Sequence, residues 1–207
     1  MGCKIDKTRD NVRLWMIWHH LRLFLLREAV SVGCICVIIG MGPGCTRQHL
    51  AEHVLIDFET DHDLDKLHWK CHVLFSISDQ HAVHGARSLR FEVYPPETYP
   101  GMTFPLPLKD WRSYRKLCFE VYNPYAIQET LVLRIDDRLD TPDFEDRFNR
   151  QLRLAPGMNH FQFPLESLRT SGTDRQLDLS DIARLIVFKV EPTQKRIFFL
   201  DYFRLSL

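Results

Sequence analysis

The stretch "KLCFEVYNPYAIQETLVLRIDD", residues 116–137, decides the fold class. Its two ends, residues 116–124 and 130–137, alternate apolar and polar side chains, and a period of two is typical of a half-buried β-strand. Successive side chains of a strand point to opposite faces, so Leu131, Leu133 and Ile135 should face a core. We therefore expect two strands that each bury one face.

The same pattern continues on both sides of this stretch. Further strand-like runs are residues 54–59, 72–78, 89–94, 101–108, 148–154, 159–163, 185–190 and 195–207. About ten short strands at this spacing predict an all-β protein, namely one antiparallel β-sandwich over residues 54–207. Only single helical turns are expected, one within residues 61–69 and one near Asp178.

Composition limits the function classes. The chain has 207 residues, and its 27 Lys and Arg balance 27 Asp and Glu. A net charge of zero gives no field that would recruit nucleic acid, so we predict no nucleic-acid partner. The length allows one good-sized domain with an appendage.

The N-terminus is different in kind. Residues 29–42, "AVSVGCICVIIGMG", are uncharged and follow Arg22 and Arg27, as in the apolar region of a signal peptide. The small residues in "GPGC" directly before Cys45 resemble a bacterial lipobox, whose cysteine carries lipid. We predict that residues 1–45 are a signal and lipobox segment lipidated at Cys45. The alternatives are an uncleaved membrane anchor over about residues 23–44, or a segment that is neither lipidated nor an anchor.

Both the lipidated segment and the uncleaved anchor would place residues 54–207 at the cell envelope, attached to the membrane. Cys71 and Cys118 are then the only cysteines of the predicted sandwich. They could pair in an oxidising compartment, but two buried free thiols is the preferred interpretation. No cysteine or histidine spacing predicts zinc.

One polar face is the candidate ligand site. Consecutive strands are usually neighbours in a sheet, so residues 116–123, 130–137, 147–154 and 159–163 should share one face. Their outward side chains offer arginine forks, carboxylates, amides and an aromatic ring, which suit a ligand rich in hydroxyl groups. The predicted ligand-binding residues are Glu120, Tyr122, Arg134, Asp136, Arg147, Asn149 and Gln162. The alternative is a solvated face held by cross-strand ion pairs.

The sequence favours a noncatalytic domain. A glycosidase needs two facing carboxylates, for which Glu120 and Asp136 are the candidates. Arg134 and Arg147 beside them would depress their pKa values and spoil a general acid. No GxSxG, HExxH or P-loop motif is present.

Several motifs resemble a known group of domains. They are "LIDFE", "GARSLRFEV", "YPGMTFPLPLKDWRSYRKLCFEVYNP", "LRIDDR", "DRFNRQLRLAPGMNHFQFPL" and "FFLDYFRL", which together cover nearly all of residues 54–207. They resemble the galactose-binding-like jelly rolls of carbohydrate-binding modules, with family 11 modules as the nearest named group. The resemblance implies a jelly roll that binds a glycan on aromatic platforms of a concave face, where Tyr122 is the main aromatic residue expected.

The resemblance also implies a structural calcium ion near the first and last strands. By position, its oxygen ligands would come from Asp57, Glu59, the backbone around Gly85, and Asp201. The alternative is that these acids cap backbone amides. The predicted function is glycan binding at the envelope, and the alternative is a structural or protein-interaction sandwich of an envelope complex.

Overall fold

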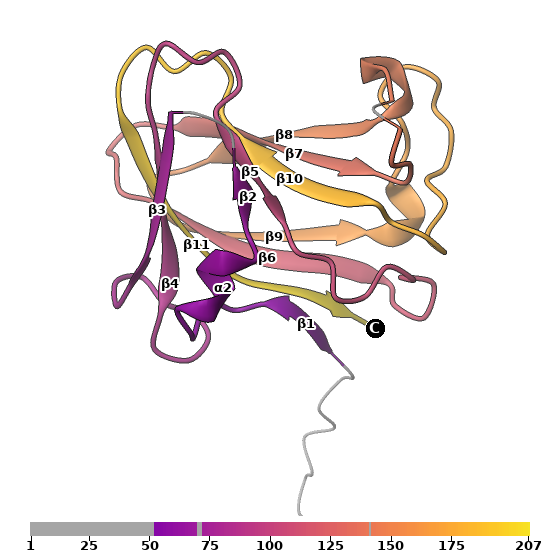
Figure 1. Ribbon diagram of the computed structural model, residues 1–207, viewed down its shortest axis with the longest axis horizontal. Coiled ribbons are helices and arrows are strands. Elements are labelled where there is room, and N and C mark those ends of the chain that lie inside the picture. Colours follow the sequence, from indigo (N-terminus) through magenta and orange to yellow (C-terminus); the bar gives the residue numbers. More distant parts are fainter. Residues whose placement is uncertain (1–51, 70–71, 141) are drawn as a thin grey trace, which may run out of the picture. The chain divides into compact units, whose positions relative to one another are not determined.

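The computed structural model describes residues 52–69, 72–140 and 142–207, which form a two-sheet β-sandwich (Figure 1). The elements are β1 (His53–Ile56), α2 (His62–Asp65), β2 (His68–Trp69), β3 (Val73–Ser78), β4 (Ser88–Val93), β5 (Gly101–Phe104), β6 (Lys116–Asn123), β7 (Glu129–Asp136), η1 (Phe144–Asp146), β8 (Phe148–Leu154), β9 (Gly157–Pro164), η2 (Leu165–Ser167), β10 (Arg184–Phe188) and β11 (Arg196–Ser206).

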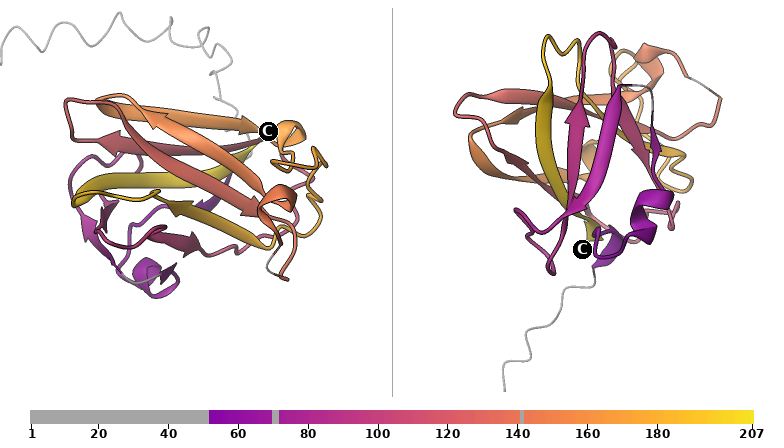
Figure 2. Two further views of the ribbon diagram at one scale, coloured as in Figure 1. Left: turned by 90° about the horizontal axis from the view of Figure 1, so that it is seen from above. Right: turned by 60° about the vertical axis from the view of Figure 1, so that its left-hand side comes forward.

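The strands form two antiparallel sheets, seen from further directions in Figure 2. Sheet A has the order β3-β4-β11-β6-β9, and β1 also pairs with β11. Sheet B has the order β2-β5-β10-β7-β8. Each pairing between these strands is antiparallel. The predicted antiparallel β-sandwich is confirmed.

The core lies between the sheets, where the alternating residues meet. Leu131, Leu133 and Ile135 of β7 are fully buried, as predicted. From sheet A, the Phe119 ring stacks on Phe203 with centroids 4.6 Å apart. Because each buried Leu or Phe side chain stabilises the fold by about 1.5–3 kcal/mol, the alternation pins every strand to one orientation.

A β-bulge in β11 changes which residues face the core. The register of β11 against β6 shifts between Asp201 and Arg204, and Tyr202 has a positive φ of 53°. Leu200 before the bulge and Phe203 after it are both fully buried, although they are three residues apart. The extra residue leaves both Asp201 and Tyr202 off the core-facing row.

The prediction that four strands share one face is wrong. Strands β6 and β9 are neighbours in sheet A, whereas β7 and β8 are neighbours in sheet B. The connection between β6 and β7 crosses from one sheet to the other. Alternation predicts which side of a strand is buried, but it does not say which sheet the strand joins.

Smaller predictions have mixed outcomes. The helical turn in residues 61–69 is confirmed as α2. The turn near Asp178 is not helical; instead Asp178 Oδ1 accepts hydrogen bonds from the backbone and hydroxyl of Ser180. Cys118 is a buried free thiol, while Cys71 lies outside the described residues.

The predicted signal, lipobox or anchor segment, with Cys45, also lies outside the described residues. In the part of the chain that the structure describes, no helix is long and apolar enough to span a membrane.

The core can be tested with two identical substitutions. Leu133→Ala removes a fully buried side chain of β7 and should lower the free energy of unfolding by about 2–5 kcal/mol. Leu74→Ala on β3, where the side chain is 60% exposed, should change it by less than about 0.5 kcal/mol. Urea denaturation of both variants measures the difference, and equal losses would contradict this assignment of the core.

Candidate functional site

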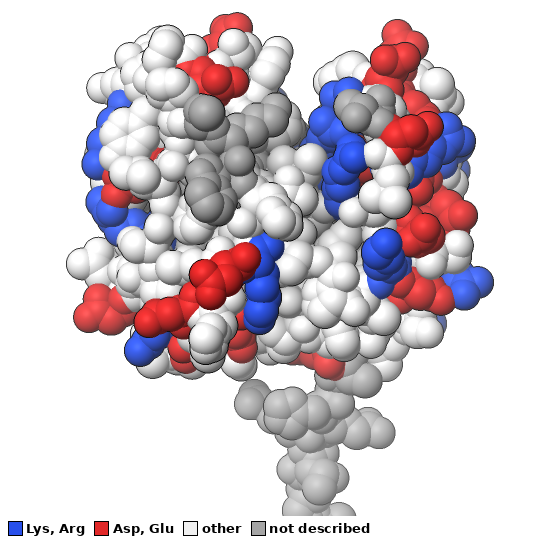
Figure 3. Space-filling model, viewed as in Figure 1, with Lys and Arg blue, Asp and Glu red and all other residues white. Residues whose placement is uncertain are grey.

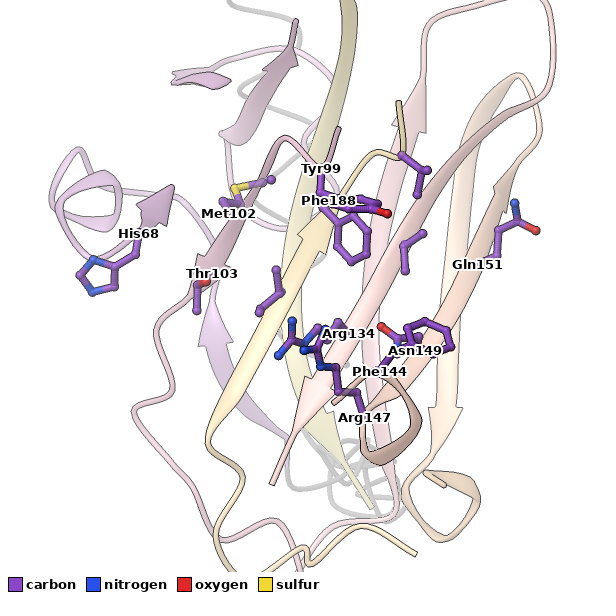
Figure 4. A pocket seen from close by; sticks show the side chains of 14 residues that line it. His68, Tyr99, Met102, Thr103, Arg134, Phe144, Arg147, Asn149, Gln151 and Phe188 are labelled. Carbon is purple, nitrogen blue, oxygen red and sulfur yellow. The ribbon is translucent and has the colours of Figure 1, made fainter. Parts of the chain in front are cut away.

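The candidate site is a pocket of about 750 Å³ on the outer face of sheet B (Figure 4). Every strand of this sheet contributes to its lining. The lining residues are His68, Tyr99, Gly101, Met102, Thr103, Val132, Arg134, Phe144, Arg147, Asn149, Gln151, Ile186, Phe188 and Val190.

The floor of the pocket is built from cross-strand rows. Partners directly opposite each other in a sheet project from the same face. The antiparallel register therefore places five side chains in a first row across sheet B, in the order His68, Thr103, Ile186, Arg134 and Asn149. One residue from each strand thus contributes to a single line across the floor.

A second, more apolar row runs beside the first. Its members, in order, are Gly101, Phe188, Val132 and Gln151. A side chain at Gly101 would overlap Cβ of Phe188, so glycine leaves the space that Phe188 needs. The Tyr99 ring then packs edge-on against Phe188, with centroids 5.9 Å apart and planes at 89°.

The polar end of the floor rests on a buried carboxylate. Asp136 is fully buried and accepts two hydrogen bonds from Arg134, from Nε at 2.8 Å and from Nη2 at 2.6 Å. Arg184, its cross-strand partner, adds an Nη1 contact at 3.5 Å. The bidentate pair fixes the plane of the Arg134 guanidinium where it borders the pocket.

The loop that carries Phe144 is held by a second ion-pair cluster. Arg175 donates to both oxygens of Asp137, at 2.6 and 3.0 Å, and to Asp146 Oδ1 at 3.0 Å. Burial would raise the pKa of Asp137, but the hydrogen bonds from Arg175 and from the backbone N–H of Asp178 lower it. Phe144, which precedes Asp146 in η1, remains 63% exposed at the pocket rim.

The space-filling view agrees with this composition (Figure 3). The surface is hollowed between two lobes, and its floor shows uncharged side chains. Lys or Arg atoms stand on the right-hand wall. No Asp or Glu is among the described residues that line the pocket.

The predicted ligand-binding residues separate into two groups. Three of them, Arg134, Arg147 and Asn149, line the pocket, and Asp136 lies behind Arg134. The others, Glu120, Tyr122 and Gln162, belong to the strands β6 and β9 of sheet A. The structure thus brings four of the seven predicted residues together at the pocket of sheet B.

The sheet A residues have other partners. Glu120 is buried and forms an ion pair with Arg204 at 2.9 Å. The Tyr122 ring stacks on His81 with centroids 3.5 Å apart. Tyr122 therefore lies on the sheet opposite the pocket, and its predicted role as the main aromatic residue of a ligand face stays a prediction.

The aromatic residues of the pocket were missed, although one left a signal. In β10, Leu185 and Val187 are fully buried, so Ile186 and Phe188 point outward. Two large apolar residues on the outward side of a strand mark a surface that is not simply solvated. Tyr99 and Phe144 stand in connections, where alternation carries no information.

The predicted calcium ligands gather around one loop, residues 83–87. Asp201 Oδ2 accepts from the N–H groups of Val83 and His84, at 2.6 and 3.0 Å. Glu59 Oε1 accepts from those of Ala86 and Arg87, at 3.1 and 2.9 Å. One oxygen of Asp201 and both oxygens of Glu59 therefore accept hydrogen bonds from backbone N–H groups of this loop.

Asp57, Gly85 and the second oxygen of Asp201 complete this set. Asp57 Oδ2 lies 3.6 Å from Nδ1 of His84, and Gly85 packs against the Glu59 side chain. Asp201 Oδ1 is buried without a hydrogen-bond partner among the described atoms, and burial raises the pKa of this carboxyl. Within the described residues, no three His, Cys, Asp or Glu side chains form a metal-binding group. This arrangement fits amide capping better than calcium, which stays a prediction.

Other solved structures share this fold. No family model matches the sequence, and no curated protein matches it. The structure is similar to the family 11 carbohydrate-binding module from Clostridium thermocellum, solved in complex with a β-1,3-1,4-mixed-linked tetrasaccharide. The two share 17% identity with a TM-score of 0.58, over 75% of this chain and 95% of that one.

Two agarases contain a similar domain. An exo-β-agarase matches with 18% identity and a TM-score of 0.60, over 74% of this chain and 25% of that one. A second agarase matches with 16% identity and a TM-score of 0.58, over 75% of this chain and 24% of that one. These likenesses establish the fold, and they confirm at that level the resemblance seen in the motifs.

The buried pair under the pocket should be essential for stability. Asp136→Asn leaves Arg134 and Arg184 without their shared charge and should lower the free energy of unfolding by about 3 kcal/mol or more. Asp140→Asn, an exposed acid a few residues further on, should change it by less than about 0.5 kcal/mol. Urea denaturation compares them, and equal values would show that Asp136 is not a structural anion.

Substitutions of the acids around the loop 83–87 distinguish amide capping from calcium binding. Asp201→Ala removes the acceptor of two backbone N–H groups and should lower the free energy of unfolding by about 1–3 kcal/mol, with or without EDTA. Asp57→Ala should have little effect, because Asp57 caps no amide of this loop. If calcium instead raised the melting temperature, and both variants lost that rise, the ion would be the stabilising partner.

Proposed function

We propose that this domain is a noncatalytic carbohydrate-binding module that holds an oligosaccharide in the pocket of sheet B. The observation that carries the proposal is the composition of that pocket: exposed aromatic rings stand beside a fixed guanidinium and two amide side chains. Sugars present apolar C–H faces and hydroxyl groups together, so both kinds of surface are needed in one place.

The apolar part of the pocket suits the face of a sugar ring. Tyr99 and Phe144 are 49% and 63% exposed, and Phe188 is half-buried beside Tyr99. Rings that stay exposed in the folded protein keep their apolar area available for a ligand. Figure 4 shows Tyr99 and Phe188 together toward one end of the pocket, with Phe144 toward the other.

The polar part suits hydroxyl groups. Arg134 is held flat by Asp136, and Asn149 faces it directly across β7 and β8. Asn149 Nδ2 donates to Ser171 Oγ at 3.3 Å, which leaves its carbonyl oxygen as an acceptor for the pocket. Donors and acceptors that are fixed before binding give orientation at little entropic cost.

The comparisons support the same function. The family 11 module that shares this fold was solved with a bound tetrasaccharide, and the match covers nearly all of that module. In the agarases the match covers about a quarter of the chain, as expected for an accessory domain. The absence of a carboxylate from the described pocket lining supports a binding role, because a glycosidase needs two.

We further propose that the domain works at the cell envelope, tethered by lipid on Cys45 or by an uncleaved anchor. The support is the apolar run at residues 29–42 and the small residues before Cys45. Metabolic labelling with a clickable fatty acid tests it: Cys45→Ala should abolish labelling if the cysteine is lipidated.

Glycan binding can be tested with the purified full-length chain. A glycan array followed by calorimetry should find at least one bound oligosaccharide. Phe144→Ala and Tyr99→Ala should each weaken its affinity about tenfold, which corresponds to about 1.4 kcal/mol of lost aromatic contact. Neither ring is buried in the core, so the fold should survive.

A matched control lies on the other sheet. Tyr122→Ala also removes an aromatic ring, but from sheet A, and it should leave the affinity unchanged. If no glycan binds, and instead a co-purifying protein is lost from Phe144→Ala, the alternative of a protein-interaction sandwich would replace this proposal.

A further inference from the structure

The charge of the pocket is unbalanced at one end. In Figure 4, Arg134, Arg147 and Asn149 lie together near Phe144, away from Tyr99. Arg134 and Arg184 share the single buried carboxylate of Asp136, at 2.6 and 3.5 Å. One negative charge therefore pairs with two guanidinium groups, and Arg147 adds a third positive charge nearby.

Arg147 has no carboxylate of its own within the described residues. Its Nε donates to the backbone carbonyl oxygen of Pro142, which fixes the side chain without neutralising it. No described Asp or Glu lies within ion-pair distance of its guanidinium, and its two Nη groups have no described hydrogen-bond acceptor. They are donors that remain available in the pocket.

The surroundings of Arg147 make its charge costly. Burial and the positive charge of Arg134 lower the pKa of the Arg147 guanidinium, although Asp136 and Asp143 offset part of this effect. Asp136 is already shared, and Asp143 is exposed on the loop, where solvent and salt screen it. A bound anion would relieve this repulsion.

The described lining residues of the pocket carry no negative charge. Arg134 and Arg147 are the Lys, Arg, Asp or Glu residues of the described lining, and both are cationic. A cavity lined by one sign of charge concentrates the opposite sign, and guanidinium forks match planar oxyanions. A neutral sugar would use these donors for hydroxyl groups but would leave the charge unbalanced.

We propose that the pocket prefers an acidic oligosaccharide, and that a carboxylate or sulfate group of one sugar residue binds the free Nη groups of Arg147. This inference rests on the proposed glycan-binding function and narrows it to a class of ligand. The acidic sugar lies at the arginine end, next to Phe144, and a neighbouring sugar covers Tyr99 and Phe188.

The test uses oligosaccharides that differ only in charge. Cellotetraose is compared with its C6-carboxylate form, and a neutral galactan tetrasaccharide with its sulfated form, by calorimetry on the full-length chain. In at least one pair the acidic member should bind ten times more tightly or better in low salt. That advantage should shrink toward the neutral value as salt is raised, because screening weakens ion pairs.

Two arginine variants, one directly before β8 and one within it, locate the effect. Arg147→Gln should reduce the acidic preference to less than about threefold, because it removes the charge while the glutamine amide keeps hydrogen-bond donors for hydroxyl groups. Arg153→Gln removes the same charge from β8, at an exposed position outside the pocket lining, and should keep the full preference. The salt dependence of the unmodified chain gives a readout that needs no variant.

The outcomes separate the two proposals. If neutral members bind as tightly as acidic ones, or if Arg147→Gln keeps the acidic preference, this inference fails while glycan binding stands. If no member of any pair binds and the array is empty, both fail. A preference for carboxylate over sulfate, or the reverse, identifies which oxyanion the site accepts.

Discussion

The contact between the apolar inner faces of the two sheets is the constraint on which the site depends. Leu131, Leu133 and Ile135 are fully buried. Because successive side chains of a strand point to opposite faces, the residues between them on β7 face outward. This places Val132, Arg134 and Asp136 on the outer face of sheet B, whether the side chain is apolar or charged. The same constraint on β10 turns Ile186 and Phe188 outward, and the antiparallel register aligns both sets in rows.

This constraint also explains how far the sequence could lead. A period of two recurs in nearly every strand, which is why the sandwich and the core-facing residues of β7 were predictable. Whether β6 and β7 shared a sheet was not predictable, because the connection after Asn123 gives no sign that the chain crosses the core. The predicted face was therefore split, with Glu120 on sheet A and Arg134 on sheet B.

Side chains outside the strands were the second feature of the site that could not be predicted from the sequence. Phe144 owes its place to the cluster of Arg175, Asp137 and Asp146, whose members are close in space but up to 38 residues apart in sequence. Burial of Asp137 is tolerated because Arg175 and a backbone N–H group satisfy its oxygens. Sequence alone could flag these residues as a charged loop, but it could not show that the loop is organised and forms a pocket wall.

The pairing of β1 with β11 determines how such a domain can be joined to other chain segments. His53 lies opposite Leu205, so the entry and the exit of the sandwich are adjacent on sheet A. The pocket belongs to the other sheet, and neither end of the domain contributes to its lining. A domain whose ends are adjacent can be inserted into a loop of a host protein, or circularly permuted, without a change in its binding face.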